Sequence, residues 1–398
     1  MRAKLLFDLD ETLVSTAHLQ PYFTTNEGKE YIANNIDQIP TELKHPELLK
    51  LVRSYHKNES AIILTNSPPA YARNLLNKHG FPADLPVYAA LNKPHLPLLE
   101  RMLREENINL EEAIFVGDSA IDILSAHAID IASTAVTWGN TSTEEQLKRA
   151  EPQKIVSDYQ DLEKAISDFE NRAYSYQPRL DPDNYLQVDN RINQQDEVEL
   201  NILDLGKYIP YSRGNSDQFS KEIMRFKKCK NHLLREIKAN SRDKFFYNGQ
   251  VRDGSTFISA LTHFLKLAAP HLEKRIFPAD TCLIPLPNSL PEYCYKTDIN
   301  LLFTRDLAKL TGKKVINERI AYRLEPVQEA HLGGSRSEER HYRSSGFLNL
   351  EKINGASQIV LFDDITTSGS QLKAFARMLR FCGFKGKISA MVLGKTTA

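Results

Sequence analysis

Two aspartates near the beginning of the chain have the type and spacing that can bind a metal ion. Asp8 and Asp10 lie at the end of the apolar stretch Leu5–Leu9, which is typical of a buried strand. Ligands of open α/β sheets bind at the carboxyl ends of strands, and two carboxylates this close repel each other unless a divalent cation lies between them. The pair therefore predicts a metal site at a strand end, although an acidic surface turn can have the same sequence.

Further polar residues follow two later apolar stretches. Thr65 comes directly after Ala61–Leu64, and Lys93 precedes a predicted helix. Asp118 and Asp122 follow a third apolar stretch. Carboxylates hold Mg²⁺, while threonine and lysine orient and neutralise phosphoryl oxygens. Together these residues predict a site for Mg²⁺ and a phosphoryl group, whereas Lys93 taken alone is equally typical of a solvated lysine at a helix start.

The order and spacing of these motifs resemble the haloacid dehalogenase (HAD) superfamily of phosphatases over roughly residues 1–165. By this resemblance, Asp8 would be the nucleophile that forms an aspartyl-phosphate, and Asp10 would be the general acid and base. Thr65 would bind the phosphoryl group, and Lys93 would hold the nucleophile and phosphate charges together. The residues that the resemblance implies for Mg²⁺ are Asp8, Asp10, Asp118 and Asp122, the last as a ligand or an anchor.

The spacing of the motifs leaves little room for a cap domain. Thr65 follows Asp8 by 57 positions, and Asp118 follows Lys93 by 25. The first interval has room for a flap and one or two helices, and the second for a helix and a strand. We therefore expect an uncapped or minimally capped HAD fold, which suits a bulky substrate, a polymer end or closure by another domain.

A second polar segment follows an apolar stretch late in the chain. Gln358–Phe362 is predicted to be a strand, and Asp363 and Asp364 follow it directly. Small hydroxyl residues and Gly369 then lead into the predicted helix Gln371–Phe381. Such a loop can bind a phosphate at the helix N-terminus, and the carboxylates can accept hydrogen bonds from two sugar hydroxyls. A capped turn is the structural alternative.

This segment resembles the signature of type I phosphoribosyltransferases, which bind 5-phosphoribosyl-1-pyrophosphate (PRPP), and the ComF-like group in particular, over roughly residues 200–398. The resemblance implies a pyrophosphate loop at Cys282–Ser289 and a mobile hood over Tyr322–Phe347. Arg336 and Arg340 of that hood are equally typical of solvated loop charges. The residues implied for PRPP binding are Asp363, Asp364, Thr366, Thr367, Ser368, Gly369 and Ser370.

Short apolar runs alternate with amphipathic segments in both halves of the chain, which predicts α/β sheets with helices on both faces. We expect two Rossmann-like domains, a HAD-like domain over residues 1–168 and a phosphoribosyltransferase-like domain over residues 200–398. Residues 169–199 have no sustained period and are predicted to be a linker or strap. The amphipathic segment Ser216–Lys238 is predicted to be helical.

The composition excludes several classes of protein. Of the 398 residues, 41% are hydrophobic and 26% are charged, which excludes fibrous and disordered chains. Lys+Arg and Asp+Glu both number 51, so there is no overall positive charge to attract nucleic acid. No apolar run approaches the ~20 residues of a membrane span, and the first apolar stretch is too short for a signal peptide. The four cysteines lack metal or disulfide spacing. We expect a cytoplasmic protein with no membrane partner.

Two phosphate-handling sites on one chain lead us to expect a bifunctional enzyme with small-molecule substrates. The C-terminal domain would transfer a phosphoribosyl group from PRPP to a base-like acceptor, and the N-terminal domain would hydrolyse a phosphate monoester with Mg²⁺ as cofactor. In the alternative, the C-terminal domain senses PRPP without catalysis, beside a phosphatase for nucleotides or nucleic-acid ends. Zero net charge argues against nucleic acid. Two basic clusters keep that substrate open, namely Lys227, Lys228 and Lys230, and Arg336, Arg340 and Arg343.

Overall fold

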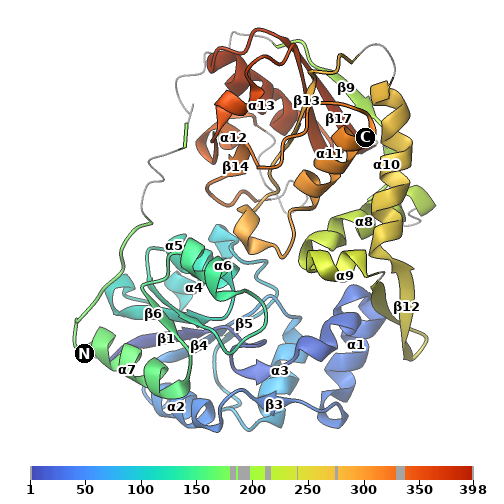
Figure 1. Ribbon diagram of the computed structural model, residues 1–398. Helices are drawn as coiled ribbons and strands as arrows, with labels where there is room; N and C mark the ends of the chain where they lie inside the picture. Colours follow the sequence, from blue (N-terminus) through green and yellow to red (C-terminus); the bar gives the residue numbers. More distant parts are fainter. Residues whose placement is uncertain are drawn as a thin grey trace. The chain divides into compact units, whose positions relative to one another are not determined.

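The chain divides into two compact units (Figure 1). The computed structural model describes residues 2–179, 185–186, 198–210, 217–239, 241–273, 277–328 and 337–396. The first unit combines Met1–Asp181 with Lys244–Gly254, and the remaining residues form the second unit. The sequence led us to expect residues 244–254 in the C-terminal domain. They cluster with the first unit instead because they form a hairpin whose Phe246 ring packs against Tyr22 and Tyr31.

A six-stranded parallel sheet forms the centre of the first unit, in the order β5-β4-β1-β6-β7-β8. Its strands are β1 (Lys4–Phe7), β4 (Ala61–Leu64), β5 (Val87–Tyr88), β6 (Ala113–Gly117), β7 (Ala132–Val136) and β8 (Lys154–Val156). The predicted parallel α/β arrangement is confirmed for this unit, since short apolar runs form strands that are buried on both faces. Strand β1 pairs with β4 on one side and β6 on the other, so the residues that follow these strands meet at one edge.

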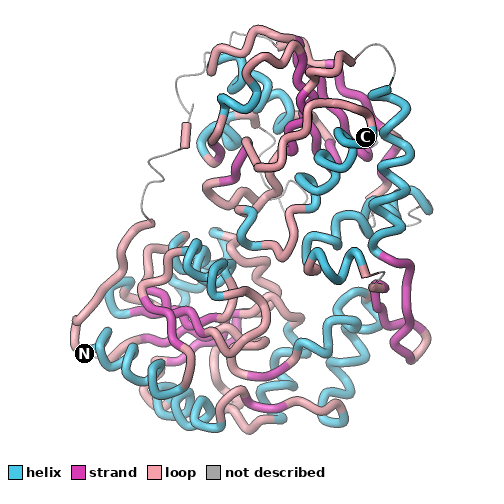
Figure 2. The backbone as a smooth tube through the Cα atoms, viewed as in Figure 1, coloured by secondary structure: helices cyan, strands magenta, loops and turns pink. Residues whose placement is uncertain are grey.

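Helices cover both faces of this sheet (Figure 2). Leu5 and Phe7 of β1 pack into one hydrophobic cluster with α2, α3 and α7, and Leu6 packs into another with α4 and α5. This alternation follows from the two-residue period of a strand. The helices are α2 (Pro46–His56), α3 (Pro69–Lys78), α4 (Leu96–Glu105), η3 (Leu110–Glu112), α5 (Ala120–His127), α6 (Glu144–Ala150) and α7 (Tyr159–Glu170).

Local sequence signals set the beginnings of these helices. Ser119 before α5 and Thr143 before α6 each form a capping box, and Asp158 caps α7. Pro69 is the first residue of α3, a position where a proline costs no hydrogen bond. The Ser119 cap also matters for the site, because it fixes Asp122 in the first turn of α5.

A short segment, which we call the flap (residues 17–38), stands in the interval between Asp8 and Thr65. It lies between the antiparallel strands β2 and β3. The elements are β2 (Val14–Ser15), η1 (Ala17–Thr24), α1 (Asn26–Asn35), η2 (Ile36–Gln38) and β3 (Glu42–Leu43). The expected small flap is thus present, and helix α2 fills most of the rest of the interval.

The hairpin of the first unit comes from far along the sequence. Strands β11 (Arg242–Tyr247) and β12 (Gln250–Thr256) are joined by Asn248 and Gly249, whose φ angles are 48° and 74°. Positive φ at both central residues is what a two-residue hairpin turn requires, and Asn-Gly adopts it readily. The ring of Phe246 contacts the flap, which brings this hairpin into the first unit.

The second unit has its own parallel sheet, in the order β10-β17-β16-β13, with β9 also pairing with β17. Its strands are β9 (Asn201–Asp204), β10 (Lys207–Tyr208), β13 (Cys282–Pro285), β16 (Gln358–Thr366) and β17 (Lys387–Thr396), and β14 (Ala321–Arg323) pairs antiparallel with β15 (Ser345–Phe347). Its helices are α8 (Gln218–Lys228), η5 (Cys229–Asn231), α9 (Leu234–Lys238), α10 (Phe257–Glu273), η6 (Glu292–Cys294), α11 (Ile299–Leu310), α12 (Glu339–Arg343), η8 (Leu350–Ile353) and α13 (Ser370–Phe381). Both faces of the sheet are covered by apolar clusters.

Two expectations differ from the structure in this region. The helical segment expected over Ser216–Lys238 is divided into α8, η5 and α9, because the chain is extended at His232 and Leu233 before α9 begins; Ser216 itself lies outside the described residues. Within the expected linker, α7 continues to Glu170, and Leu186 forms an antiparallel bridge with Phe347, the last residue of β15. Among the described residues, no helix combines the length and apolar character needed to span a bilayer.

Candidate active site

One edge of the first sheet gathers the polar residues that the sequence singled out. Asp8 and Asp10 follow β1, Thr65 follows β4 and Asp118 follows β6, while Lys93 lies between β5 and α4. All five line one cavity of about 630 Å³. The carboxyl edge of the sheet therefore brings together residues that are more than one hundred positions apart in sequence.

Lys93 is buried between two aspartates. Its Nζ lies 2.7 Å from Oδ1 of Asp8 and also contacts Oδ1 of Asp122. Burial alone would lower the pKa of Lys93, but Asp122 and Asp8 outweigh it and raise the pKa above its usual value. Burial raises the pKa of Asp8 well above its usual value, with Lys93 opposing the shift and Asp122 adding to it. The three groups form a buried, charged centre with one cation and two carboxylates.

Asp118 brings a third carboxylate to this centre. One oxygen of Asp118 accepts a hydrogen bond from the backbone N–H of Thr141 at 3.1 Å, and the hydroxyl of Thr12 lies within 3.3 Å of the carboxylates of both Asp118 and Asp8. Burial and the nearby Asp122 raise the pKa of Asp118 to about 7. A Cβ atom on Gly139 would lie 2.2 Å from Oδ2 of Asp118, so only glycine leaves room for this carboxylate.

Asp8, Asp118 and Asp122 can each direct one carboxylate oxygen to a common point, because these oxygens lie within 4.8 Å of one another. Burial, and after it the repulsion from neighbouring carboxylates, raises the pKa of Asp8 and Asp118. The cluster has three buried carboxylates and one ammonium group, that of Lys93, so negative charge is in excess. A hard divalent cation such as Mg²⁺, which prefers oxygen ligands, would compensate that charge. The residues present therefore fit the Mg²⁺ that the sequence predicted.

Asp10 was also predicted as a metal ligand, but its carboxylate is not in this group. Oδ2 of Asp10 accepts a hydrogen bond from the hydroxyl of Ser67 at 2.6 Å, and Oδ1 accepts one from Tyr71 at 2.9 Å. The hydroxyl of Thr65 lies 3.4 Å from the same carboxylate. The side chain of Asp10 is thus turned toward β4 and α3, away from the three clustered carboxylates, while it still lines the cavity.

Asp122 has the geometry of an anchor. Its Oδ2 accepts hydrogen bonds from the backbone N–H and the hydroxyl of Ser119, and its Oδ1 contacts Lys93. A Cβ atom on Gly117 would collide with this carboxylate. Ser119 shapes the backbone at the start of α5 and lines the cavity without contacting Asp8. These contacts favour the role that positions Lys93, while Asp122 also belongs to the three clustered carboxylates that could hold a metal ion.

Sequence reasoning missed several polar partners of these residues. Ser67 is a hydroxyl residue two positions after Thr65, but its hydrogen bond to Asp10 was not predicted. Tyr71 points back from α3, and Thr12 and Thr141 support Asp118 from loops. Thr12 also had a usable signal, because it is a hydroxyl residue two positions after Asp10.

In the second unit, the acid pair and the hydroxyl loop differ from the expectation in one respect. Strand β16 continues through Asp363 and Asp364 to Thr366 and does not end before them. Burial and the neighbouring Asp364 raise the pKa of Asp363 well above its usual value, and Nζ of Lys227 lies 3.5 Å from Asp364. This pair therefore also carries an excess of buried negative charge.

The loop after β16 is closed by its own hydrogen bonds. The hydroxyl of Thr366 accepts a hydrogen bond from the N–H of Gly369 at 3.0 Å, and Ser370 N–H donates to Ser368 Oγ at 3.4 Å. Gly369 has a φ of 75° and precedes the first residue of α13. Thr367 is exposed and bonds to Thr396 on β17. The loop thus begins a twelve-residue helix, with the left-handed conformation at a glycine.

A buried arginine connects this loop to two other segments of the second unit. Arg323 on β14 is 1% exposed. Its hydrogen-bond acceptors are the carbonyl of Asn288, the hydroxyls of Ser344 and Ser345, the Nδ1 of His341 and the Oε1 of Gln371. Burial, together with Arg340, lowers its pKa to about 9. Arg323 is thus a buried cation whose hydrogen-bond acceptors, within the described part of the chain, carry no negative charge.

The basic residues noted in the sequence have intramolecular partners. Lys228 pairs with Asp243 at 3.0 Å, and Lys230 lies 4.4 Å from the ring centre of Tyr295. Arg340 donates to the carbonyl of Gln328, and Arg343 pairs with Glu339. Arg336, with the rest of residues 329–336 of the expected hood, lies outside the described residues. These contacts hold the described basic side chains within the second unit.

Comparison with known proteins gives one family match. Residues 90–162 match a family model described as HAD-hydrolase-like. This span includes Lys93, Asp118 and Asp122 but not Asp8 or Asp10. The match shows a HAD-hydrolase-like segment within the first unit, and it does not extend to the second unit. No curated protein matches the chain.

Several solved structures are similar to part of the chain. A hydrolase from Pseudomonas syringae is 15% identical with a TM-score of 0.37, and the similarity covers 42% of this chain and 99% of that one. A predicted phosphatase from Clostridium acetobutylicum is 17% identical with a TM-score of 0.33, covering 42% and 100%. A HAD family hydrolase from Deinococcus radiodurans R1 with bound phosphate and sodium is 17% identical with a TM-score of 0.34, covering 45% and 99%.

Proposed function

We propose that the first unit is a HAD-like phosphatase that hydrolyses phosphate monoesters through a covalent phosphoryl group on Asp8. The observation that carries this proposal is the placement of Lys93, whose ammonium group lies 2.7 Å from Asp8 at the carboxyl edge of the sheet and in one cavity with Asp10. A carboxylate held beside a buried cation can receive a phosphoryl group whose negative charge that cation also compensates. The family match over residues 90–162 supports the same chemistry.

In the first step, a carboxylate oxygen of Asp8 attacks the phosphorus of the ester. The new bond joins that oxygen to phosphorus, and the bond between phosphorus and the leaving alcohol oxygen breaks. Asp10, protonated at this stage, gives its proton to the leaving oxygen. Ser67 and Tyr71 fix the orientation of the Asp10 carboxyl group, and the hydroxyl of Thr65 beside it can donate to the phosphoryl group.

In the second step, Asp10 takes a proton from a water molecule that attacks the phosphorus. The bond between Asp8 and phosphorus breaks, inorganic phosphate leaves, and Asp8 is again a free carboxylate. The lysine and the carboxylates keep their positions throughout, because Asp122 holds Lys93 and Ser119 holds Asp122. Asp8 and Asp118 would hold Mg²⁺, which when bound would reduce the repulsion between Asp8 and the phosphate dianion.

The test is hydrolysis of p-nitrophenyl phosphate with Mg²⁺. We expect Asp8→Asn to abolish turnover, because a carboxamide is nearly isosteric with the carboxylate but cannot act as the nucleophile. Asp161→Asn is the matched control, since Asp161 is exposed on α7 outside the cavity. Turnover that is equal in the Asp8 variant and the control would contradict the proposal.

For the second unit, we propose PRPP-dependent transfer of a phosphoribosyl group to a base-like acceptor, which would make the chain bifunctional. The specific support is the buried guanidinium of Arg323, which contacts Asn288 after β13 and Gln371 at the start of α13. A buried cation with neutral acceptors favours an anionic ligand. Asp363 and Asp364 would accept hydrogen bonds from the ribose hydroxyls, and residues Thr366–Ser370 would surround the 5′-phosphate.

A PRPP-sensing domain without transfer chemistry is the alternative for the second unit. Calorimetry with PRPP and Mg²⁺, followed by measurement of pyrophosphate release with a library of nitrogenous bases, separates the two. Binding with base-dependent pyrophosphate release supports transfer, whereas binding without release supports sensing. Absence of PRPP binding would contradict both.

A further inference from the structure

The flap contributes its own group of side chains to the phosphatase cavity. Gln20 and Phe23 from η1 and Lys29 from α1 line it, whereas the other lining residues come from the loops that follow the strands and the adjoining helix starts. These three residues include an amide, an aromatic ring and a cation. None of them was singled out from the sequence.

The two lysines that line the cavity differ in their surroundings. Lys93 is buried and is neutralised by Asp8 and Asp122. Lys29 is half-buried, and no ion pair joins its ammonium group to a carboxylate among the described residues. Lys93 already serves the reacting phosphoryl group in the proposed mechanism. Lys29 therefore brings to the cavity an ammonium group that is not engaged in an ion pair with a carboxylate of the described residues.

Phe23 offers an apolar surface on the same segment. Its ring meets Tyr71 edge-on, with ring centres 5.1 Å apart, and Tyr71 in turn donates to Asp10. A planar or apolar part of a leaving group that extends from the phosphorus toward the flap would contact this ring. The cavity volume of about 630 Å³ suits a small molecule.

The position of Lys29 in the flap is closely constrained. Gly28 precedes it, and a Cβ atom there would lie 2.2 Å from the carbonyl oxygen of Tyr22, so helix α1 packs directly against η1. Thr25 caps α1 by accepting a hydrogen bond from the N–H of Gly28. The backbone that carries Lys29 is thus fixed relative to the backbone that carries Phe23. Both side chains line the same cavity.

We propose that Lys29 is a specificity residue that selects phosphate monoesters whose leaving group bears a second anionic group. This inference rests on the proposed phosphatase function. The reacting phosphoryl group lies beside Asp8 and Lys93, the body of the leaving group contacts Phe23, and its anionic group pairs with Lys29. A carboxylate and a second phosphate or phosphonate share the required charge.

The experiment compares three substrates with one aromatic frame: 4-carbamoylphenyl phosphate, 4-carboxyphenyl phosphate and 4-(phosphonomethyl)phenyl phosphate. The first is neutral at the distal end, and the other two distinguish a carboxylate from a phosphonate. For the wild-type protein we expect a KM about tenfold lower for the favoured anionic substrate than for the neutral one, as for one charge-assisted contact. Lys29→Gln should remove that difference and leave kcat for the neutral substrate unchanged.

Two further variants make the result specific. Lys29→Arg keeps the charge and should keep the preference. Lys50→Gln makes the same exchange at an exposed lysine of α2 outside the cavity and should also keep it.

Equal KM values for all three substrates in the wild type, or an unchanged preference in Lys29→Gln, would overturn the inference while the phosphatase function stands. An equal loss of kcat on all three substrates in Lys29→Gln would overturn it too, because Lys29 would then serve the reacting phosphoryl group. Hydrolysis of none by the wild type would overturn the proposed function itself.

Discussion

At the scale of single residues, the proton carried by Asp10 controls both proposed steps. Its two carboxylate oxygens accept hydrogen bonds from Ser67 and Tyr71. These donors hold the carboxyl group at the cavity without joining it to the three clustered carboxylates. The separation lets Asp10 exchange a proton while Asp8 and Asp118 remain available to a metal ion.

We expect Asp10→Asn to lower kcat for an alkyl phosphate by a factor of about 10² to 10⁴, which is the usual contribution of general acid–base catalysis. An amide cannot supply the proton that an alcohol leaving group needs. Tyr71→Phe should lower kcat by less, because the carboxyl group remains and loses one donor. Steady-state kinetics measure both changes, and a larger loss in Tyr71→Phe than in Asp10→Asn would argue against this role for Asp10.

His341 of the second unit gives a prediction about pH. Burial, then Arg323 and Arg340, lower its pKa from 6.5 to about 2. Below pH 6.5 the unfolded chain binds a proton at this histidine and the folded chain does not, so the free energy of unfolding falls as the pH falls from about 6.5 toward 2. The stabilisation is therefore present above the unfolded pKa and is lost in acid.

When the pH is lowered from 7.5 to 5, we expect the free energy of unfolding of His341→Asn to fall by less than that of the wild type. Urea unfolding at the two pH values measures the difference, and the contributions of other titrating groups cancel between the two proteins. Equal losses in both proteins would mean that His341 is protonated in the folded state.

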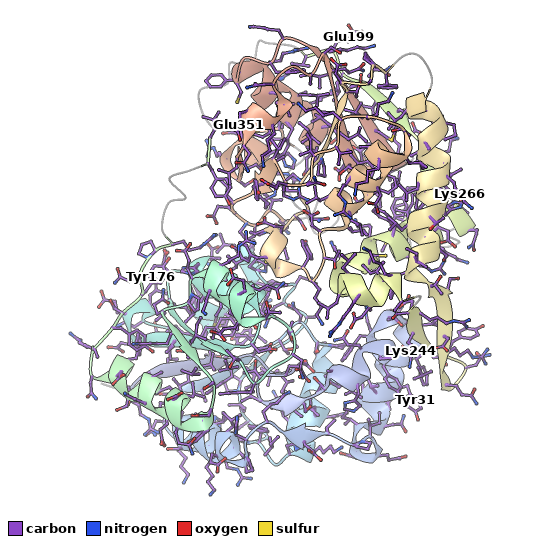
Figure 3. The ribbon with its side chains drawn as sticks, viewed as in Figure 1. Tyr31, Tyr176, Glu199, Lys244, Lys266 and Glu351 are labelled. Carbon is purple, nitrogen blue, oxygen red and sulfur yellow. The ribbon has the colours of Figure 1, made fainter. Side chains whose placement is uncertain are left out.

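At the scale of elements, the hairpin β11–β12 supports the flap. The centre of the Phe246 ring lies 4.9 Å from the ring centre of Tyr22 and 4.5 Å from that of Tyr31. The hydroxyl of Thr25 donates a hydrogen bond to the Phe246 carbonyl. Tyr31 on α1 and Lys244 on β11 are labelled in Figure 3. The flap that carries the cavity residues is thus held by a segment about 220 positions away in sequence.

We expect Phe246→Ala to loosen the flap, because the ring is 2% exposed and its removal leaves a cavity between the two tyrosines. Hydrogen exchange should quicken in residues 26–35, while β1 and β6 keep their protection. Val251→Ala, at an exposed position of the same hairpin, is the control. Unchanged exchange in α1, or equal quickening throughout the sheet, would contradict a supporting role for the hairpin.

The sequence predicts the strands and helices of the sheets far better than it predicts the flap and the hairpin. The strand at Ala61–Leu64 was predicted to the residue, because a short apolar run between amphipathic segments is typical of a buried strand. The hairpin did carry a signal, the Asn248-Gly249 turn, but its strands are mostly exposed and lack an apolar pattern. Long-range packing of Phe246 on Tyr31 has no local signature at all.

The site residues divide in the same way. Asp8, Lys93 and Asp118 follow strands or begin a helix, and such positions can be recognised from spacing. The direction of a side chain cannot, which is why Asp10 was expected among the metal ligands and is instead bonded to Tyr71. Lys29 lacks a motif, and only the fold brings it to the cavity.

At the scale of the whole molecule, each of the two units has a group of carboxylates near the carboxyl end of a strand of its sheet. Asp8 and Asp118 belong to the first unit, and Asp363 and Asp364 belong to the second. Each carboxylate group has its own cation, Lys93 in one and Lys227 in the other. The two sites therefore have separate charge balances.

We expect variants of the second site to leave the first one unaffected. Asp364→Ala should weaken PRPP binding by roughly 1.5–3 kcal/mol through the loss of a charged acceptor, and Gly369→Val should block the phosphate, since Gly369 has a φ of 75° and little space beside it. Calorimetry measures both effects. Turnover of p-nitrophenyl phosphate should match the wild type, and its loss in Asp364→Ala would mean that the two sites are coupled.

The covalent intermediate on Asp8 is the centre of this account, and mass spectrometry after acid quenching tests it most directly. Protein is mixed briefly with p-nitrophenyl phosphate and Mg²⁺, quenched and digested. The leaving group of this substrate needs no proton, so Asp10→Asn should accumulate the intermediate and add the mass of one phosphoryl group to the peptide that contains Asp8. Asp8→Asn should show no such addition. Turnover by the wild type with no phosphorylated peptide in the Asp10 variant, or the same phosphorylated peptide in Asp8→Asn, would contradict the account.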